Sequence, residues 1–258
     1  MSSLIEVKVE KQIGYLTMNR PEKLNALSKE LVAEMNQALD SLAANDEVKV
    51  IILAGNGKSF CAGGDIDSMK TMNTPAAAND WIEYVSGLSK KILTLDKYVV
   101  AAVHGYAAGA GFSLALAADF IVAEKEAKFA LSFTNIGLIP DLGLIKLLTE
   151  RVSPPVAKEW ISSGKVLTAE EVREANIINR IVDGSAIEGA VEFAQFIVNG
   201  PSISNKFVKY LVNHVGELHK ETAFKQENLI QTLLLQTEDH QEGANAFFEK
   251  RRAQFKGL

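Results

Sequence analysis

Two glycine-bearing segments place backbone N–H groups where a ligand could reach them. Residues 60–66 (Phe-Cys-Ala-Gly-Gly-Asp-Ile) follow an apolar run, and residues 105–111 (Gly-Tyr-Ala-Ala-Gly-Ala-Gly) lie between another apolar run and a predicted helix. Such small side chains leave the backbone open, and a helix N-terminus adds about +0.5 of a charge. Two amides that converge on one oxygen form an oxyanion hole, each contributing about 3 kcal/mol of transition-state stabilisation.

Each segment taken alone could also be no more than a tight turn between a strand and a helix. A dinucleotide-binding fingerprint is a second alternative, because Gly109 and Gly111 supply its first two glycines. Leu114 occupies the position of the third glycine, however, and the segment lies in the middle of the chain. The fingerprint normally opens the first strand–helix unit, so the sequence disfavours a nucleotide site.

The pattern of apolar residues predicts the elements that position these segments. Residues 5–10 and 13–18 are typical of a hairpin, and Ser28 is a predicted N-cap. Apolar runs at 48–53, 98–103 and 120–123 predict buried strands, with helices at 81–92 and 112–118 and a loop at 59–68. Alternating strands and helices indicate an α/β fold with parallel pairing.

The character of the chain changes after about residue 154. Thr168 begins a capping box, and residues 177–182 form the last strand-like run. Three or four helices are expected after this run, and a break near residue 200 separates the core from a helical tail with apolar residues on more than one face. We therefore expect a core over residues 1–200 and a helical region for oligomerisation and CoA capping over residues 201–258.

Composition excludes several classes of function. The 258 residues are 47% hydrophobic and carry a net charge of −5, which argues against nucleic acid or an anionic membrane as partner. The single cysteine allows no internal disulfide, and the four histidines lack the spacing of a metal site. We therefore expect no metal. Neither an N-terminal signal nor an apolar run of membrane-spanning length is visible, so we expect a cytoplasmic protein.

Several motifs, in order along nearly the whole chain, resemble those of the crotonase (enoyl-CoA hydratase/isomerase) superfamily. Besides residues 60–66, they are Asn19-Arg-Pro-Glu-Lys-Leu-Asn-Ala-Leu27, Ala102-Val-His-Gly-Tyr-Ala-Ala-Gly-Ala-Gly111, Ala118-Asp-Phe120, Ile136-Gly-Leu-Ile-Pro140 and Phe248-Glu-Lys-Arg-Arg-Ala-Gln-Phe255. The resemblance implies a spiral of ββα turns whose C-terminal helices pack protomers into trimers, commonly paired as hexamers. It also implies a coenzyme A (CoA) thioester as substrate, with no further cofactor.

The resemblance assigns roles to individual residues. The oxyanion-hole amides would be those of Gly64 and Ala110. The substrate and its CoA would contact a larger set, in which Ala62, Asp65 and Ile66 hold the adenine and Lys250 contacts a phosphate: Lys23, Leu24, Ala26, Ala62, Asp65, Ile66, Tyr106, Gly109, Phe133 and Lys250.

Hydratases that this chain resembles use two glutamates, whose positions here hold Ser113 and Phe133. Neither side chain exchanges protons near neutral pH, which argues against the usual hydration chemistry. Asp141 instead matches the catalytic aspartate of dienoyl-CoA isomerases, ring-epoxide phenylacetyl-CoA isomerases and 4-chlorobenzoyl-CoA dehalogenases, and the surrounding residues are most similar to the phenylacetate-pathway isomerase. Burial against Phe133 and Ile139 would raise its pKa. A helix N-cap is the structural alternative for Asp141.

We therefore expect an enoyl-CoA isomerase with Asp141 as base. An enoyl-CoA hydratase and a non-catalytic acyl-CoA-binding subunit remain alternatives. A dehalogenase-like nucleophile is disfavoured, because its histidine would fall near Ser86, where the chain has none. We expect Cys61, His104 and Asp119 to be structural. Bulky side chains predict a pocket for an aromatic or medium-length acyl group: Met69, Trp81, Tyr84, Phe112 and Phe133. Fatty-acid breakdown and phenylacetate breakdown remain alternative pathways.

Overall fold

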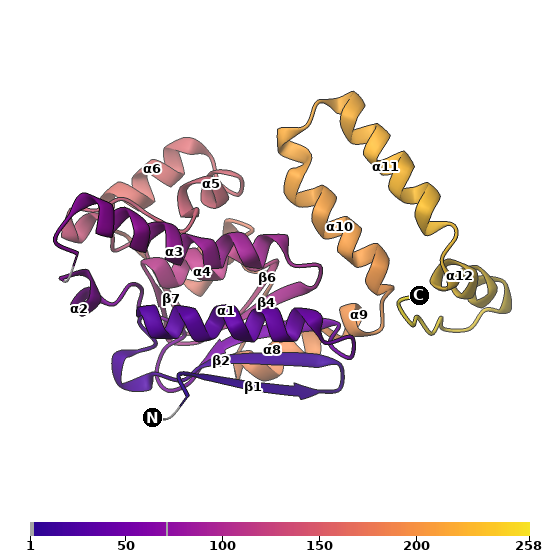
Figure 1. Ribbon diagram of the computed structural model, residues 1–258, viewed down its shortest axis with the longest axis horizontal. Coiled ribbons are helices and arrows are strands. Elements are labelled where there is room, and N and C mark those ends of the chain that lie inside the picture. Colours follow the sequence, from indigo (N-terminus) through magenta and orange to yellow (C-terminus); the bar gives the residue numbers. More distant parts are fainter. Residues whose placement is uncertain (1–2, 71) are drawn as a thin grey trace.

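A six-stranded sheet lies at the centre of the protein, in the order β1-β2-β3-β4-β6-β9. This computed structural model describes residues 3–70 and 72–258 (Figure 1). The hairpin β1 (Ile5–Glu10) and β2 (Ile13–Met18) is antiparallel, as predicted. The other strands pair in parallel: β3 (Val50–Gly55), β4 (Tyr98–Val103), β6 (Phe120–Glu124) and β9 (Arg180–Val182). The last strand covers only half of the predicted run 177–182.

A second sheet of three short strands was not predicted. It contains β5 (Tyr106–Ala108), β7 (Lys128–Ala130) and β8 (Val166–Thr168), each three residues long. β5 lies within the glycine-rich segment 105–111, which the sequence predicted as loop. Three residues are too few for an alternating pattern to be recognisable, and these strands exist because each has a partner elsewhere in the chain.

Helices cover both faces of the large sheet, because its strands carry apolar side chains on both. In β3, Ile51 and Leu53 belong to one core cluster, whereas Val50 and Ile52 belong to the other. The core cluster on the first face also contains residues of α1 (Lys29–Ala44), α3 (Pro75–Thr94), α4 (Ala110–Ala117), α5 (Leu144–Thr149), α6 (Pro154–Ser163) and α7 (Ala169–Glu174). The second face is covered by α8 (Ala186–Phe193) and α9 (Gln195–Val198). The Ser28 cap and the Thr168 capping box are confirmed.

The remaining elements include short 3-10 helices and a helical extension. The 3-10 helices are η1 (Pro21–Lys23), η2 (Thr134–Ile136) and η3 (Val215–Glu217), and α2 (Ile66–Met69) is a single turn. From residue 202 onward, α10 (Ser202–His214), α11 (Lys220–Leu234) and α12 (Glu238–Glu249) project from the core (Figure 1), and we call residues 202–258 the C-terminal arm.

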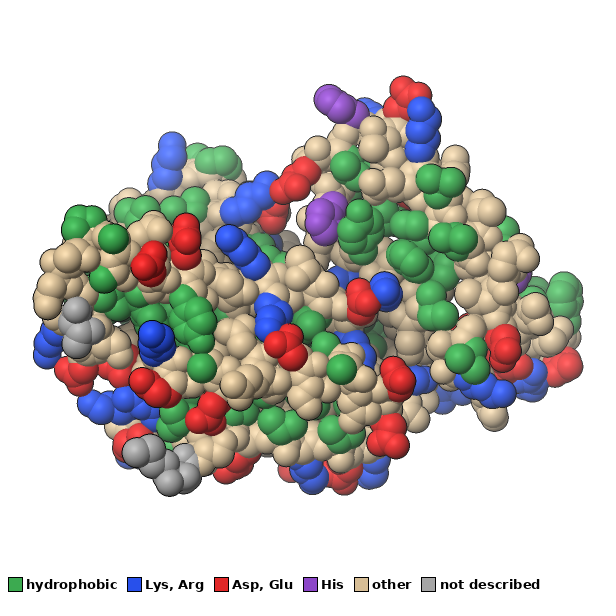
Figure 2. All heavy atoms as spheres, in the orientation of Figure 1, with side chains coloured by type: hydrophobic (Ala, Val, Ile, Leu, Met, Phe, Trp, Pro, Cys, Tyr) green, Lys and Arg blue, Asp and Glu red, His purple; other side chains and the backbone are tan. Residues whose placement is uncertain are grey.

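Large apolar side chains are exposed along the C-terminal arm. On α11, Phe224, Leu229 and Leu233 are 62%, 68% and 62% exposed, and Phe247 and Phe248 of α12 are each 79% exposed. Figure 2 shows apolar side chains gathered on the surface of this extension. A single chain thus leaves uncovered an apolar surface of the kind that mediates contacts between proteins.

A buried ion pair fastens the C-terminal arm to the core. The Lys209 ammonium of α10 donates to the carboxylate of Asp119 (2.8 Å) and to the carbonyls of Ile92 (2.8 Å) and Lys97 (3.0 Å). The side chains of Lys209 and Asp119 are only 2% and 8% exposed, and the Asp119 carboxylate also accepts from the Val99 N–H. The structural role expected for Asp119 is thereby confirmed.

Substitution of Lys209 by methionine should lower the free energy of unfolding by about 3–5 kcal/mol, because it leaves the Asp119 charge buried and unpaired. Urea unfolding measures this loss. Lys206→Met is the control, since it breaks an exposed pair with Asp96 (2.6 Å, side chains 42% and 65% exposed) and should cost less than about 1 kcal/mol. Equal losses in the two variants would contradict the prediction.

Candidate active site

The two glycine-bearing segments lie side by side and are joined by backbone hydrogen bonds. The N–H of Cys61 donates to the Tyr106 carbonyl (3.0 Å), and the N–H of Ala108 donates to the Cys61 carbonyl (2.9 Å). A Cβ atom on Gly111 would overlap the carbonyl oxygen of Cys61 and lie 2.8 Å from its carbonyl carbon. Glycine at this position is therefore required for α4 to begin directly against segment 60–66.

The backbone amides of Gly64 and Ala110 are available to a ligand. Gly63 packs directly against the start of α4, because a Cβ on Gly63 would be 2.8 Å from the Ala108 oxygen and 3.4 Å from the Ala110 nitrogen. The helix α4 begins at Ala110, two residues earlier than predicted. The N–H of Ala110 therefore has no acceptor within the helix. Among residues 3–70 and 72–258, neither amide donates a hydrogen bond to another residue.

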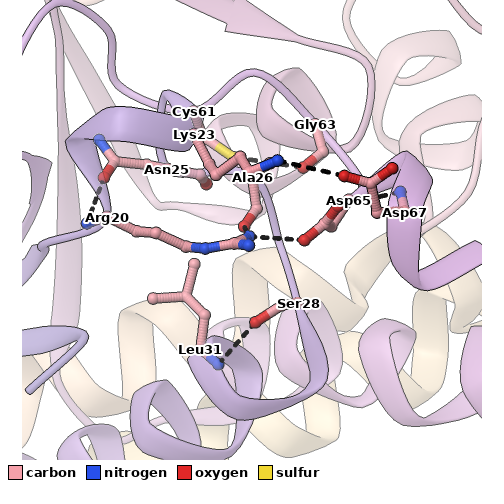
Figure 3. A network of polar contacts seen from close by, with 10 residues as sticks. All are labelled: Arg20, Lys23, Asn25, Ala26, Ser28, Leu31, Cys61, Gly63, Asp65 and Asp67. Atoms are coloured by element: carbon pink, nitrogen blue, oxygen red, sulfur yellow. Dashed lines mark hydrogen bonds and ion pairs between the residues drawn. The ribbon is translucent and has the colours of Figure 1, made fainter. Parts of the chain in front are cut away.

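Buried Asn25 ties the segment around Lys23 to the first glycine-bearing segment (Figure 3). Its side-chain amide donates to the carbonyls of Asn56 and Ser59 (both 2.9 Å), and its oxygen accepts from the Arg20 N–H (2.9 Å). Its φ of +57° is one that asparagine tolerates better than most residues. Asn25 lies within the motif of residues 19–27, but its type and position there did not predict this role. The signal that could have indicated it was an asparagine in a turn whose side chain can bond several backbone groups.

Backbone hydrogen bonds bring the predicted CoA contacts together. The N–H of Ala62 donates to the Leu24 carbonyl (2.9 Å), and the N–H of Leu27 donates to the Gly63 carbonyl (2.7 Å). Ala26 lies between these two points, and the side chains of Leu24, Ile66 and Tyr106 are 40%, 58% and 49% exposed. Apolar groups are therefore accessible on the segments expected to bind CoA.

The Asp65 carboxylate holds the loop in place. It pairs with the Arg20 guanidinium (2.7 Å), which also donates to the Ala26 carbonyl (3.1 Å), as Figure 3 shows. It also caps α2 by accepting from the Asp67 N–H (3.1 Å), and α2 replaces the end of the predicted loop 59–68. Lys23 pairs with Asp67 in an exposed contact (3.1 Å). The side chain of Asp65 thus has a structural role, and its backbone is bonded as well, from its N–H to the Leu27 carbonyl (3.1 Å) and from the Met69 N–H to its carbonyl (3.2 Å).

Asp141 carries a partly buried carboxylate that no cap or ion pair explains. Its Oδ1 atom is buried without a hydrogen-bond partner, and the N-cap of α5 is Gly143, so the N-cap alternative for Asp141 is wrong. Burial raises the pKa of Asp141 to about 6, while its own backbone N–H acts to lower it. Ile139 is 74% exposed, so the expected burial against it is also wrong, whereas Phe133 is 7% exposed.

The loop that ends at Asp141 is connected to α4 at both ends. The ring of Phe133, at its start, would lie 3.9 Å from a Cβ on Gly109, the N-cap of α4. After Asp141, α5 packs on α4. The loop therefore runs beside the helix that carries the Ala110 amide.

The raised pKa of Asp141 predicts a dependence of stability on pH. A carboxyl that is harder to ionise in the folded state stabilises that state below its ordinary pKa of 3.8, and the contribution is lost as the pH rises through about 6. Asp141→Asn should therefore exceed the wild type by about 1–3 kcal/mol in free energy of unfolding at pH 8, and match it near pH 4. Urea unfolding at both pH values measures the difference. Asp183→Asn, at a side chain 93% exposed, should show no such pH dependence.

Comparison with known proteins identifies the family. Residues 8–258 match the family model described as "Enoyl-CoA hydratase/isomerase". The chain belongs to this family. It is 32% identical to the 1,2-epoxyphenylacetyl-CoA isomerase of Escherichia coli over 261 residues, and 31% identical to the 2,3-dehydroadipyl-CoA hydratase of the same organism over 258 residues, with all of each chain covered.

Solved structures show the same crotonase-like fold. The enoyl-CoA hydratase of Bacillus anthracis superimposes with a TM-score of 0.94 at 28% identity, and the match covers 99% of this chain and 100% of that protein. The enoyl-CoA hydratase of Mycobacterium smegmatis gives a TM-score of 0.92 at 29% identity, covering 98% and 99%. The expected family and fold are confirmed, and both hydratases and an isomerase are among the relatives.

Ser113 and Phe133, which stand at the positions expected for the hydratase glutamates, both lie beside the start of α4. Ser113 is fully buried, with its hydroxyl directed to the Gly109 carbonyl (3.5 Å), and the ring of Phe133 lies near Gly109. Neither side chain supplies a carboxylate beside the start of α4.

The structure corrects one further expectation. Phe112 is fully buried against Phe129, with ring centroids 5.1 Å apart, so it belongs to the core and not to a pocket. Lys250 is the C-cap of α12, which lies on the opposite side of the molecule from α2 (Figure 1), so the expected phosphate contact would have to be with CoA bound to another copy. Of the other predicted pocket residues, Met69 lies at the site, with its methyl 2.5 Å from a Cβ built on Gly64. Trp81 and Tyr84 form a tilted ring pair on α3, with centroids 6.3 Å apart.

The remaining candidate residues have structural contacts. The Cys61 thiol is buried, burial raises its pKa to about 12, and it donates to the Asn25 carbonyl (3.1 Å), so it is no nucleophile. A ring nitrogen of His104 bonds to the Gly57 carbonyl (3.1 Å). Within the described part of the chain, no three His, Cys, Asp or Glu side chains form a group that could hold a metal, and no helix is long and apolar enough to cross a bilayer.

Proposed function

We propose that this protein is an enoyl-CoA isomerase in which Asp141 moves a proton while the amides of Gly64 and Ala110 hold the enolate. The observation that carries the proposal is the partly buried carboxylate of Asp141, whose Oδ1 atom has no hydrogen-bond partner, in a site where Ser113 and Phe133 stand at the positions expected for the hydratase glutamates. A pKa near 6 leaves it mostly ionised at neutral pH, yet close enough to the working pH to take up and return a proton.

The substrate of the proposed reaction is a 3-enoyl-CoA. Asp141 takes a proton from C2, and the electron pair moves onto the thioester oxygen, where two N–H groups stabilise the charge. The proton then returns at C4 as the thioester carbonyl re-forms, which leaves the double bond between C2 and C3. No atom is gained or lost, and no cofactor is required, because the CoA thioester itself acidifies the α-proton.

We place the CoA of the substrate along Lys23, Leu24 and Ala26, with the adenine near Ala62 and the backbone of Asp65 and Ile66. Tyr106, Gly109 and Phe133 would line the acyl end. These segments are held together by the hydrogen bonds around Asn25 and carry exposed apolar side chains. One relative acts on an epoxyphenylacetyl-CoA, which makes an aromatic acyl group a candidate. We propose a cytoplasmic location for this chemistry.

Hydration is the second candidate, because a dehydroadipyl-CoA hydratase is similar over the full chain. Incubation of the protein with crotonyl-CoA and with a 3-enoyl-CoA in D₂O distinguishes the two reactions by mass and absorbance. Double-bond migration with deuterium uptake and no added water supports the isomerase. A gain of one water establishes a hydratase, and binding without conversion of either compound indicates a non-catalytic acyl-CoA-binding subunit.

We also propose that the C-terminal arm assembles the chain into a homotrimer, or into a hexamer of two trimers. The exposed apolar residues of α11 and α12 support this division into a core over residues 1–200 and an assembly region over residues 201–258. Lys250 could contact a CoA phosphate only in another copy, because α12 lies far from α2 in its own chain (Figure 1).

Light scattering should therefore give three or six times the mass of one chain. Leu229→Asp combined with Phe224→Asp should yield a smaller species, because burying the new charges in an interface is costly. Lys225→Asp on the same helix, 71% exposed and paired with Glu221, is the control and should leave the mass unchanged. A monomeric wild type would contradict the proposal.

A further inference from the structure

The chain turns sharply directly after Asp141. Leu142 has a φ of +52° and Gly143 a φ of +83°, and the N–H of Leu144 donates to the Asp141 carbonyl (3.0 Å). Two successive positive φ values closed by this hydrogen bond are those of a type I′ turn. The first central position of such a turn favours asparagine, aspartate or glycine, so leucine is unexpected there.

Burial of the side chain offsets the strain at Leu142. A left-handed backbone costs a residue with a Cβ roughly 1–2 kcal/mol, whereas full burial of a leucine contributes about 1.5–3 kcal/mol. Leu142 is 2% exposed and belongs to the core cluster that also contains Leu144 and Leu148. The other aliphatic residue with positive φ in the described chain, Leu24, is 40% exposed and lacks this compensation. The turn at Leu142 is therefore held by packing.

Among residues 3–70 and 72–258, no polar group of another residue holds the Asp141 carboxylate, which interacts only with its own backbone N–H. Its Oδ1 atom has no partner, and α4, which packs against α5, carries no charged residue. On α5 itself, Lys146 pairs with Glu150 in an exposed contact (3.0 Å), and on α6 the two charged side chains, Lys158 and Glu159, are exposed. The backbone on either side is what determines where the carboxylate lies.

We propose that Leu142 is a positioning residue, whose buried side chain and left-handed backbone together hold the Asp141 carboxylate in the orientation that buries its unpartnered Oδ1 atom. The inference rests on the proposed role of Asp141 for its catalytic meaning, but the position of the carboxylate can be measured without turnover. Strained backbone at a site of this kind persists only where the surrounding packing maintains it.

Two substitutions separate the need for a buried side chain at residue 142 from the need for a left-handed backbone there. Leu142→Gly keeps the positive φ without strain but removes the buried anchor, whereas Leu142→Val keeps an apolar side chain that resists the left-handed conformation. Leu142→Met preserves most of the packing and should retain wild-type behaviour. Leu148→Ala is the matched control, because it removes a fully buried leucine of the same cluster outside the turn.

The readouts are the pKa of Asp141 from carbon NMR of aspartate-labelled protein, and the pH profile of α-proton exchange in an acyl-CoA. We expect the glycine and valine variants to lower this pKa by about one unit or more as the carboxylate reaches water, and to slow exchange at least about tenfold. Leu148→Ala should lose stability with the pKa of Asp141 unchanged.

An unchanged pKa of Asp141 in folded Leu142→Gly and Leu142→Val proteins would overturn the inference. An equal shift of the Asp141 pKa in Leu148→Ala would also overturn it, because general loosening of the core would then explain the effect. A lowered pKa in the two Leu142 variants, together with a wild type that exchanges no α-proton, would support the inference about position and reject the proposed function.

Discussion

Asp141→Asn should lower the rate of α-proton exchange and of double-bond migration by about 10²–10⁴-fold, the usual contribution of a positioned general base. Asparagine keeps the shape of the side chain but cannot accept the proton from C2. The wild-type rate should decline as the pH falls below about 6, where the Asp141 carboxylate becomes protonated. Deuterium uptake from D₂O, followed by mass, measures the exchange directly.

Binding separates this loss from damage to the site. The amides of Gly64 and Ala110 do not depend on the Asp141 side chain, so the Asn variant should bind an unreactive acyl-CoA about as tightly as the wild type. Asp183→Asn, a change at an exposed carboxylate, should retain full activity. Rapid hydration of crotonyl-CoA that survives Asp141→Asn would show that another group handles the water, and the isomerase proposal would be wrong.

Local patterns were sufficient to predict the parts of the fold that depend on local physics. The hairpin, strand β4 with its bounds, the Ser28 cap and the Thr168 capping box follow from alternation, apolar runs and side-chain chemistry. The short strands β5, β7 and β8 do not, because each is stabilised by a partner distant in sequence.

In the candidate site, too, some features follow from local sequence and others depend on segments distant in the chain. The glycines indicated accessible amides, and the family resemblance paired Gly64 with Ala110, but the sequence did not show that α4 begins at Ala110. An aspartate shortly before a helix is an N-cap by pattern, and only the tertiary structure shows that Gly143 takes that place while the Asp141 carboxylate is partly buried. Exposure of Ile139 and the remote position of Lys250 likewise depend on how distant segments pack.

The second large effect is expected at Gly111, where α4 meets segment 60–66. The Cβ of an alanine would overlap the Cys61 carbonyl oxygen and lie 2.9 Å from the Cys61 Cβ, and the backbone there cannot yield as a flexible side chain would. Gly111→Ala should therefore move the start of α4 and separate the Ala110 amide from that of Gly64. Loss of one oxyanion donor typically lowers kcat by about 10²–10³-fold, and the exchange assay with saturating substrate measures it.

The control for Gly111→Ala is Gly87→Ala on α3, where a Cβ would meet no atom within 4 Å. That change should leave kcat unchanged and raise the free energy of unfolding by up to about 1 kcal/mol, since alanine is the better helix former. A Gly111→Ala protein that folds, binds acyl-CoA and retains wild-type kcat would show that the two amides need not be held together. The oxyanion hole would then not be the source of catalysis. A Gly111→Ala protein with wild-type affinity and a greatly reduced kcat would locate the loss in the transition state, because the affected donors stabilise charge that develops only there.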